Sequence, residues 1–324
     1  MSHDKPALYV ARLLPDPVMT HIRQRFTLVS EPNETSPSPA DVRTGLAEAD
    51  AAIVTLTERI DESALEQARR LKIVANYAVG YNNIDVAAAE QRDVVVSNTP
   101  DVLTDATADL AWALILATAR RLVEGDQLVR STRWTGWAPT QLLGTAVTGK
   151  TLGIVGMGRI GQAVARRAAG FDMQVLYHSR HPIPSPPGGA PWRMKPFPSL
   201  LAEADFISIH VPLSPDTHHL IGEKELAHMR ETAILINTAR GPIVDETALV
   251  TALRNGTIAG AGLDVFEDEP NLHAGLSELQ QVVLLPHLGS ATLMTRVKMG
   301  LICLDNIHAI LAGRQAPNRV RPRP

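Results

Sequence analysis

Residues 152–161 read Leu-Gly-Ile-Val-Gly-Met-Gly-Arg-Ile-Gly, and this stretch decides the fold of the second half of the chain. The apolar run 152–155 predicts a short buried parallel strand, and residues 162–169 predict a helix that follows it. A second apolar run, 173–177, predicts the next strand. Strand, glycine turn, helix and strand within about thirty residues form the context that a dinucleotide-binding fingerprint requires.

Each glycine of the turn has a physical role. Gly156 suits the tight turn, Gly158 lets the backbone approach a pyrophosphate, and Gly161 lets the helix pack on the strand. The phosphates would lie at the helix N-terminus, where free N–H groups and the helix dipole favour negative charge. The predicted cofactor-binding residues here are Gly156, Met157, Gly158, Arg159, Ile160 and Gly161.

Length and composition set limits on the class of protein. With 324 residues the chain is long enough for two domains, and 45% hydrophobic with 20% charged residues is typical of a soluble globular α/β protein. A net charge of −3 gives no support for a nucleic-acid surface. Cys303 is the single cysteine, which excludes an intrachain disulfide and a cysteine-rich metal site, and we expect it to be a buried helix thiol. No signal peptide or membrane-length apolar run is recognisable, so we expect a cytoplasmic protein.

Strands alternate with helices along the whole chain, which predicts parallel sheets with helices on both faces. Before residue 100 we expect five strands, at 7–14, 27–30, 51–55, 72–75 and 94–97. The helices between them are expected at 18–26, 39–49 (with Ser38 as cap), 61–70 and 86–91.

The second half continues the alternation around the fingerprint. Residues 104–130 predict one long helical stretch whose apolar residues surround it, so we expect it to be buried. Further strands are expected at 206–210, 233–237, 260–264 and 282–285, and a proline-rich surface loop at 182–198. The final predicted helix, 291–311, is a candidate to return to the first domain, and the basic tail 319–323 is expected to be a solvated, disordered end.

Three polar residues follow successive strands of the second sheet: Arg240, Glu269 and His287. The ends of parallel strands are where open α/β sheets bind ligands. An arginine can hold a carboxylate and polarise a carbonyl, a histidine can donate a proton near neutral pH, and a carboxylate beside that histidine favours its protonated form. Each alone also fits a salt bridge, a turn or an ordinary loop position, but together, downstream of the fingerprint, they favour catalysis.

Other histidines are weaker candidates. His218 and His219 lie beside a proline and lack a third ligand at metal spacing, so we predict a solvated turn and no metal site. His178 follows the second strand of the fingerprint unit, and we expect it near the adenosine ribose.

From residue 70 onward a series of motifs resembles the D-isomer-specific 2-hydroxyacid dehydrogenases, and within them most the glyoxylate/hydroxypyruvate reductases. The motifs are Asn76-Tyr-Ala-Val-Gly-Tyr-Asn-Asn-Ile-Asp85, Thr99-Pro-Asp-Val-Leu-Thr-Asp-Ala-Thr-Ala-Asp109, Gly156-Met-Gly-Arg-Ile-Gly161, His210-Val-Pro-Leu213, Asn237-Thr-Ala-Arg-Gly241, Gly262-Leu-Asp-Val-Phe266, Glu269-Pro270 and Pro286-His-Leu-Gly-Ser290.

The resemblance implies a doubly wound α/β fold with a flavodoxin-like substrate domain (1–99 plus 288–324), a Rossmann cofactor domain (100–287) and a cleft between them. It implies that Arg240 holds substrate, that His287 is the acid/base and that Glu269 pairs with His287. It also implies a substrate site that contains Leu56, Val79, Gly80, Arg240 and His287, with the backbone N–H groups of Val79 and Gly80 on the substrate carboxylate. Further cofactor contacts are implied for Thr104, Val211, Pro212, Thr238, Ala239, Arg240, Asp264, His287 and Gly289. A homodimer through the helix after residue 103 is the implied assembly.

We therefore predict NAD(P)H-dependent reduction of a small 2-keto acid. The alternatives are a dinucleotide-sensing corepressor of the C-terminal-binding type, and a dehydrogenase of another small substrate such as phosphite or formate. Formate oxidation would normally show glutamine where Glu269 stands. A pocket walled by Leu56, residues 77–81 and residues 137–139 would favour glyoxylate and hydroxypyruvate over bulky keto acids, unless Trp137 merely packs a loop.

The end of the strand 173–177 bears on the choice of cofactor. An NAD enzyme carries an acidic residue there to accept the ribose 2′-hydroxyl. This chain has Ser179 and Arg180 instead, and Asp172 lies at the opposite end of the strand. Ser179 can donate to a 2′-phosphate and Arg180 can pair with its charge, so we predict NADPH as cofactor with NADH as the weaker alternative. Stacking of Arg180 on the adenine would weaken that preference.

Overall fold

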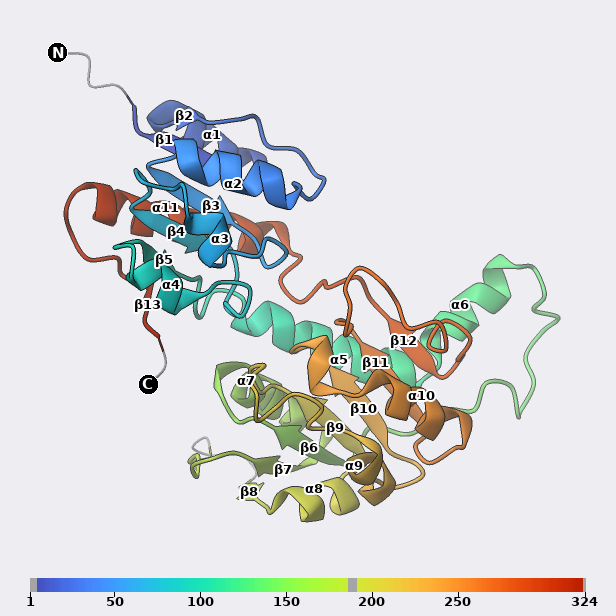
Figure 1. Ribbon diagram of the computed structural model, residues 1–324. Coiled ribbons are helices and arrows are strands. Elements are labelled where there is room, and N and C mark those ends of the chain that lie inside the picture. Colours follow the sequence, from blue (N-terminus) through green and yellow to red (C-terminus); the bar gives the residue numbers. More distant parts are fainter. Residues whose placement is uncertain (1–4, 186–190, 323–324) are drawn as a thin grey trace. The chain divides into compact units, whose positions relative to one another are not determined.

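The computed structural model of the protein describes residues 5–185 and 191–322 (Figure 1). It divides into two compact units. Unit 1 comprises Met1–Leu103 and Ala291–Pro324, and unit 2 comprises Thr104–Ser290. These boundaries lie a few residues from those that the sequence suggests, at 99/100 and 287/288.

Unit 1 is built on a six-stranded sheet with the order β13-β5-β4-β3-β1-β2. Its first five strands in the chain pair in parallel, with β13 antiparallel to β5 at the edge. The order reverses between β1 and β3, as in flavodoxin-like sheets. The strands are β1 (Ala7–Val10), β2 (Thr27–Leu28), β3 (Ala51–Val54), β4 (Ile73–Asn76), β5 (Val95–Ser97) and β13 (Arg319–Val320).

Helices cover both faces of this sheet. Successive residues of β1 alternate between two apolar clusters: Leu8 and Val10 pack with α1 and α11, whereas Tyr9 packs with α2 and α3. The helices are α1 (Asp16–Arg25), α2 (Pro39–Glu48), α3 (Glu62–Leu65), α4 (Val86–Glu90) and α11 (Leu293–Leu311). Ser38 caps α2 as expected, with Asp41 completing a capping box. Helix α11 does return to this unit, and Cys303 is buried within it.

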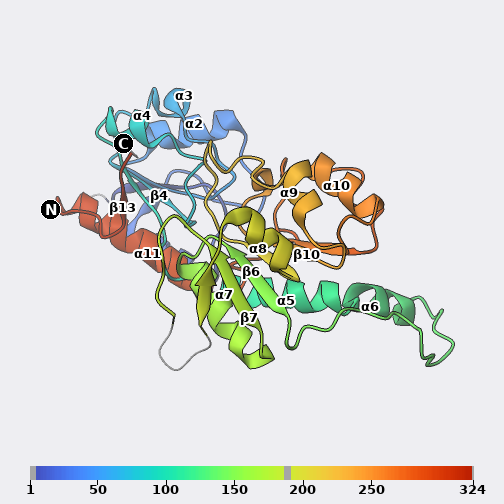
Figure 2. The same cartoon turned by 90° about the horizontal axis from the view of Figure 1, so that it is seen from below.

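Unit 2 contains a seven-stranded parallel sheet with the order β12-β11-β10-β9-β6-β7-β8, whose strands are labelled in Figure 1. Figure 2 shows three of them, β10, β6 and β7, from below. The chain starts in the middle at β6, runs outward through β7 and β8, and then returns to the other side of β6 at β9, so the order reverses between β6 and β9. The strands are β6 (Thr151–Val155), β7 (Gln174–His178), β8 (Trp192–Met194), β9 (Phe206–Ile209), β10 (Ile234–Asn237), β11 (Gly260–Leu263) and β12 (Val282–Leu284).

The helices of unit 2 again form two layers. Along β6, Ile154 packs in the cluster that contains α5 and α7, and the next residue, Val155, packs in the cluster with α8, α9 and α10. These helices are α5 (Thr104–Ala119), α6 (Leu122–Arg130), α7 (Arg159–Ala168), α8 (Phe197–Glu203), α9 (Glu223–His228) and α10 (Glu246–Arg254), with 3₁₀ turns at Ala169–Phe171 and Gly241–Ile243. The expected doubly wound α/β class is therefore confirmed in both units.

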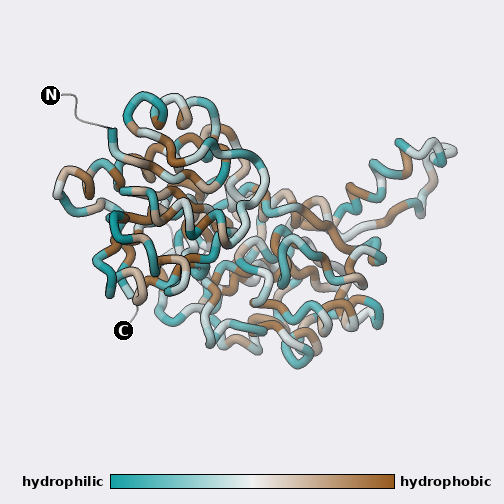
Figure 3. Tube along the Cα trace, turned by 45° about the horizontal axis from the view of Figure 1, so that its top comes forward, coloured by the Kyte–Doolittle hydropathy of each residue, from teal (hydrophilic) through white to brown (hydrophobic). Residues whose placement is uncertain are grey.

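The expectation of one buried helix over 104–130 is wrong in its second half. Arg121 adopts a left-handed backbone conformation with φ 52°, and this ends α5 and begins α6. Helix α5 is buried along most of its length, but α6 has no buried residue. Helix α6 and the segment that follows it form an arm that extends from the rest of unit 2, and Figure 3 colours several stretches of this arm as hydrophobic.

Three other local expectations need correction. The predicted loop 182–198 contains β8 and the start of α8, apart from residues 186–190, which lie outside the described residues. The predicted disordered tail contributes β13, because Arg319 and Val320 pair with the edge strand β5 and Arg319 contacts Glu90 at 3.2 Å. Helix α3 is also shorter than the predicted 61–70. In the described ranges, no helix is sufficiently long and apolar to cross a bilayer.

Candidate active site

The glycine turn after β6 lies at the point where the strand order of unit 2 reverses. Gly156 has φ +97°, and a Cβ there would lie 2.7 Å from the backbone carbon of His210, which follows β9. A Cβ on Gly161 would lie 2.2 Å from the carbonyl oxygen of Gly156. Both positions therefore require glycine, one for the turn and one for close packing of α7, as the sequence predicts.

Gly158 differs from the other two glycines, because nothing lies within 4 Å of the position that its Cβ would take. It is the N-cap of α7 and offers no side chain to the first-turn N–H groups of that helix. The helix N-terminus is thus left accessible to a diphosphate that would bind to backbone donors. These residues fit a dinucleotide, because the backbone at Gly158 leaves open the space that a side chain would fill.

The residues that end and follow β7, from His178 to His181, include no carboxylate. His178 ends the strand and its Nδ1 lies 3.1 Å from the carbonyl oxygen of Lys195. The hydroxyl of Ser179 donates to the carbonyl of His181, and Arg180 is exposed. The exposed guanidinium of Arg180 gives this edge of the sheet positive rather than negative charge, and the Ser179 hydroxyl beside it is neutral.

The turn after β10 is fixed by the buried side chain of Asn237. Its amide nitrogen donates to the Arg240 carbonyl at 2.9 Å, and its oxygen accepts from the Ala239 N–H at 3.0 Å. A Cβ on Gly241 would lie 1.9 Å from the carbonyl carbon of Phe266, so the turn after β10 touches the turn after β11 backbone to backbone. This contact brings Arg240 to the neighbourhood of Glu269. Burial lowers the pKa of Arg240 and the charge of Glu269 opposes that shift.

Glu269 and His287 form a hydrogen-bonded pair. The Oε2 atom of Glu269 lies 2.8 Å from Nδ1 of His287, and its Oε1 accepts from the Phe266 N–H at 3.0 Å. Burial disfavours ionisation of Glu269, but its hydrogen bond to His287 and the charges of His287 and Arg240 outweigh burial, so its pKa is lowered. The pair leaves Nε2 of His287 as the ring nitrogen that can face a reactant.

Asp264 fixes the segment that carries His287. Its fully buried carboxylate accepts from the N–H groups of Leu288 at 2.6 Å and Gly289 at 2.8 Å, and its carbonyl accepts from the His287 N–H at 2.9 Å. The carbonyl of Gly289 in turn accepts from Thr107 on α5 at 2.9 Å. His287 is held with φ 56°, a conformation that costs free energy in a non-glycine residue and persists where its surroundings determine it. Sequence reasoning assigned Asp264 to the cofactor and missed this positioning contact.

In unit 1, side-chain amides bind the backbone carbonyls of Val79 and Gly80. The carbonyl of Val79 accepts from Asn98 and that of Gly80 accepts from Asn76, each at 2.8 Å. Among the described residues neither N–H group of this pair has a hydrogen-bond acceptor, and both residues are half-buried. Leu56 lies after β3 in the same unit and is also half-buried.

The other predicted cofactor contacts lie around the same edge of the unit 2 sheet. Val211 and Pro212 follow β9, Thr238 and Ala239 follow β10, and Thr104 begins α5. Met157 is buried in the cluster of α5 and α7, whereas Arg159 and Ile160 form the first turn of α7. Trp137 is 81% exposed on the arm, so its side chain does not pack against a loop of the described residues.

The chain is similar in sequence and in fold to known proteins. Residues 112–289 match the model of the D-isomer specific 2-hydroxyacid dehydrogenase NAD binding domain. The chain belongs to the D-isomer-specific 2-hydroxyacid dehydrogenases. A glyoxylate reductase from Thermococcus litoralis is 48% identical over 320 residues, which cover 98% of this chain and 97% of that protein.

Solved structures resemble the chain over nearly its whole length. A protein from Thermus thermophilus has a TM-score of 0.92 with 43% identity, covering 97% of this chain and 99% of that one. The NADPH-dependent glyoxylate/hydroxypyruvate reductase from Sinorhizobium meliloti, solved with NADP and malonate, has a TM-score of 0.87 with 35% identity, covering 99% of this chain and 100% of that one. The family resemblance that the motifs indicate is thus confirmed.

Proposed function

We propose that this dehydrogenase reduces glyoxylate and similar small 2-keto acids, such as hydroxypyruvate, with NADPH. The observation that carries the proposal is the hydrogen bond of 2.8 Å between Glu269 and His287. Glu269 lies on the turn after β11, and that turn packs against the turn that carries Arg240. A proton donor, its carboxylate partner and a permanent cation are the groups that reduction of a keto acid requires. Glyoxylate reductases among the relatives support the choice of substrate.

In this proposal each residue has a distinct task. The nicotinamide cofactor supplies the hydride when bound. The guanidinium of Arg240 binds the substrate and stabilises the negative charge that grows on the carbonyl oxygen. His287 donates the proton from Nε2 to that oxygen, and Glu269 orients the ring through its hydrogen bond to Nδ1.

The substrate carboxylate is assigned to the N–H groups of Val79 and Gly80. The carbonyl of Ala78 accepts from the Thr99 N–H at 3.0 Å and that of Val79 accepts from Asn98 at 2.8 Å. The N–H groups of Val79 and Gly80 lie in these two peptide planes, so they are oriented before a ligand arrives. Leu56 supplies an apolar contact that suits a substrate without a bulky side chain. These assignments follow the resemblance to the family and the local geometry of unit 1.

The cofactor preference is assigned to Ser179 and Arg180. A 2′-phosphate adds negative charge that an acidic residue would repel, whereas an exposed guanidinium pairs with it. The reductase from Sinorhizobium meliloti, described as NADPH-dependent, supports NADPH for this chain.

The exposed arm is proposed as the contact between two copies of the chain. Six of the twelve large hydrophobic residues that are exposed among the described residues lie on it, and such a concentration is typical of a protein interface. Val123 and Leu143 also border a hollow of about 400 Å³ that α5 and β12 help to line. The six residues are Leu122, Val123, Val129, Trp134, Trp137 and Leu143.

A panel of 2-keto acids assayed with NADPH tests the proposed substrate class. We expect the highest kcat/KM for glyoxylate or hydroxypyruvate, because the groups assigned to the substrate hold only its carboxylate and carbonyl. Phenylpyruvate as the best substrate would contradict the assignment of a small pocket. No turnover with any keto acid would favour a nucleotide-sensing role.

Replacement of the proton donor is the second test. His287→Asn keeps a polar side chain of similar size but cannot donate a proton as an acid, so kcat should fall by roughly 10²- to 10⁴-fold. Cofactor affinity, measured by fluorescence titration, should barely change. The matched control is His228→Asn, an exposed histidine on α9, which should retain native turnover. Near-native turnover of the His287 variant would remove it from the mechanism.

The cofactor assignment is tested by comparing kcat/KM for NADPH and NADH. The native protein should prefer NADPH, and Arg180→Ala should lose efficiency with NADPH while NADH is little affected, because only NADPH carries the 2′-phosphate. The control is Arg166→Ala, which removes the same charge from the last turn of α7, at the end of the helix away from the glycine turn. It should change neither value. A native preference for NADH, or an equal loss with both cofactors, would contradict the assignment.

The oligomeric state can be read by size-exclusion chromatography with light scattering. The native protein should be a dimer, and Val129→Glu should shift it toward monomer, because a buried unpaired carboxylate is costly in an apolar interface. Gln127→Glu adds the same charge on the same helix without removing an apolar side chain, and it should leave the dimer largely intact. A native monomer would reject the interface.

A further inference from the structure

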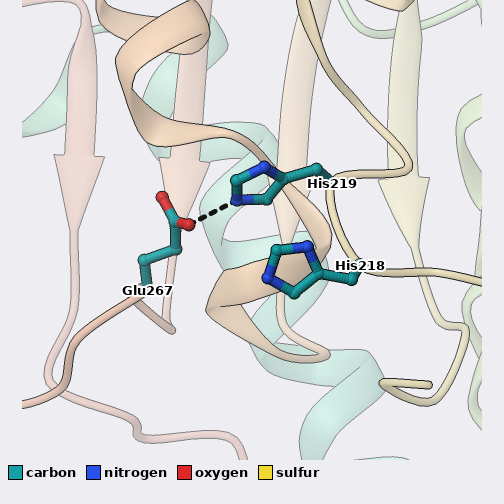
Figure 4. A group of neighbouring side chains, drawn as sticks. All are labelled: His218, His219 and Glu267. Carbon is teal, nitrogen blue, oxygen red and sulfur yellow. Dashed lines mark hydrogen bonds and ion pairs between the residues drawn. The ribbon is translucent and has the colours of Figure 1, made fainter. Parts of the chain in front are cut away.

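His218, His219 and Glu267 form a cluster on unit 2 that the proposed reaction does not use (Figure 4). The two histidines lie in the connection after β9, and Glu267 lies in the turn after β11. One ring nitrogen from each histidine and one carboxylate oxygen lie within 4.8 Å of one another. The sequence could not indicate this third group, because Glu267 is 48 positions from His219.

The backbone turns both imidazole rings to the same side. His219 has φ 50°, and its ring stacks on that of His218 with centroids 4.1 Å apart. The N–H of His218 donates to Ser214 at 2.9 Å, and that of His219 donates to Pro242 at 2.8 Å. The two rings are therefore presented together by an anchored backbone.

The carboxylate of Glu267 is also oriented before any ligand arrives. Its Oε2 accepts from the Glu246 N–H at 3.1 Å, while the N–H of Glu267 donates to the Glu246 carboxylate at 2.8 Å. This reciprocal pair leaves Oε1 directed at the histidines, 2.5 Å from Nε2 of His219 (Figure 4).

A second carboxylate lies on the far side of the His219 ring. Oδ2 of Asp245 is 3.9 Å from Nδ1 of His219, while Oδ1 of Asp245 caps α10. Histidines that bind metals commonly direct their other ring nitrogen to a carboxylate, which fixes the ring and makes the ligating nitrogen more basic. The negative charges of Glu267 and Asp245 together favour a cation between the rings and Oε1.

We propose that His218, His219 and Glu267 bind a divalent transition-metal ion, with Zn²⁺ as the best match. Two imidazole nitrogens and one carboxylate oxygen are ligands that Zn²⁺ accepts, and water would complete the coordination. Binding through Nε2 of His219 displaces the hydrogen between that atom and Oε1 of Glu267. An imidazolium ring releases that proton, whereas a neutral ring keeps its single proton on Nδ1, which faces Asp245.

The geometry requires only side-chain adjustment. Tetrahedral Zn²⁺ with bonds of about 2.0–2.2 Å places its ligand atoms roughly 3.3 Å apart. The pair at 2.5 Å must therefore open slightly, and ligand atoms as far apart as 4.8 Å must approach one another. Both histidines are exposed and Glu267 is half-buried, so these rotations disturb no core packing. The bound ion would join the connection after β9 to the turn that leads to Glu269.

The test is Zn²⁺ binding by untagged full-length protein that has been treated with a chelator and then dialysed. Isothermal titration should give one strong site per chain, and Zn²⁺ should raise the melting temperature because it binds the folded state. His218→Ala removes an exposed imidazole that makes no side-chain hydrogen bond among the described residues, and it keeps the backbone bond to Ser214, so the variant should fold normally. The variant should bind Zn²⁺ at least about tenfold more weakly. Loss of a residue that only hydrogen-bonds to a metal ligand already costs about that much, and His218 is itself a ligand.

Two further measurements separate a built site from scattered surface binding. His228→Ala removes an exposed histidine elsewhere on unit 2 and should bind Zn²⁺ as the native protein does. Cu²⁺ at the site should show coupling to two nitrogens in its electron paramagnetic resonance spectrum, reduced to one in His218→Ala. Equal Zn²⁺ affinity in native protein and His218→Ala, or no saturable binding, would overturn the proposal and leave the cluster as a surface ion pair.

Discussion

The arrangement of unit 2 depends on one backbone contact, between Gly241 and the peptide of Phe266. A Cβ at Gly241 would lie 1.9 Å from the Phe266 carbonyl, so the turns after β10 and β11 can meet only because residue 241 has no side chain. Interiors are packed too densely to absorb such an overlap without moving the backbone. The contact sets the distance between Arg240 on one turn and both Glu267 and Glu269 on the other.

Buried polar side chains then fix the direction of the loops at this sheet edge. Asn237 and Asp264 end or follow neighbouring strands, and each is at most 1% exposed. Their polar atoms bind backbone groups of the Arg240 turn and of the His287 segment. An unpaired buried amide or carboxylate is costly, so these bonds restrict each loop to few conformations. Burial raises the pKa of Asp264, and its hydrogen bond from the Leu288 N–H opposes that shift.

The fingerprint glycines divide into structural and functional positions by the space around them. Gly156 and Gly161 are needed by the fold, since a Cβ at either would meet backbone atoms at less than 3 Å. Gly158 has no such neighbour, so the fold itself would accept alanine there. A ligand that approaches the N-terminus of α7 explains why residue 158 has no side chain. The same sequence motif thus carries two different constraints.

The sequence by itself determined the alternation of strands and helices, the nucleotide-binding turn and the three polar residues after successive strands. These features are local, because apolar runs, glycine spacing and strand ends are read within a few residues. Only the tertiary structure decided which loops meet. It joins Glu267 to His218 and His219, directs Asp264 to the backbone after His287, and pairs the C-terminal Arg319 and Val320 with β5. It also breaks the helical stretch at Arg121, whose left-handed conformation no apolar pattern indicates. The physical reason is that these contacts join residues far apart in the chain, and packing rather than local propensity sets their geometry.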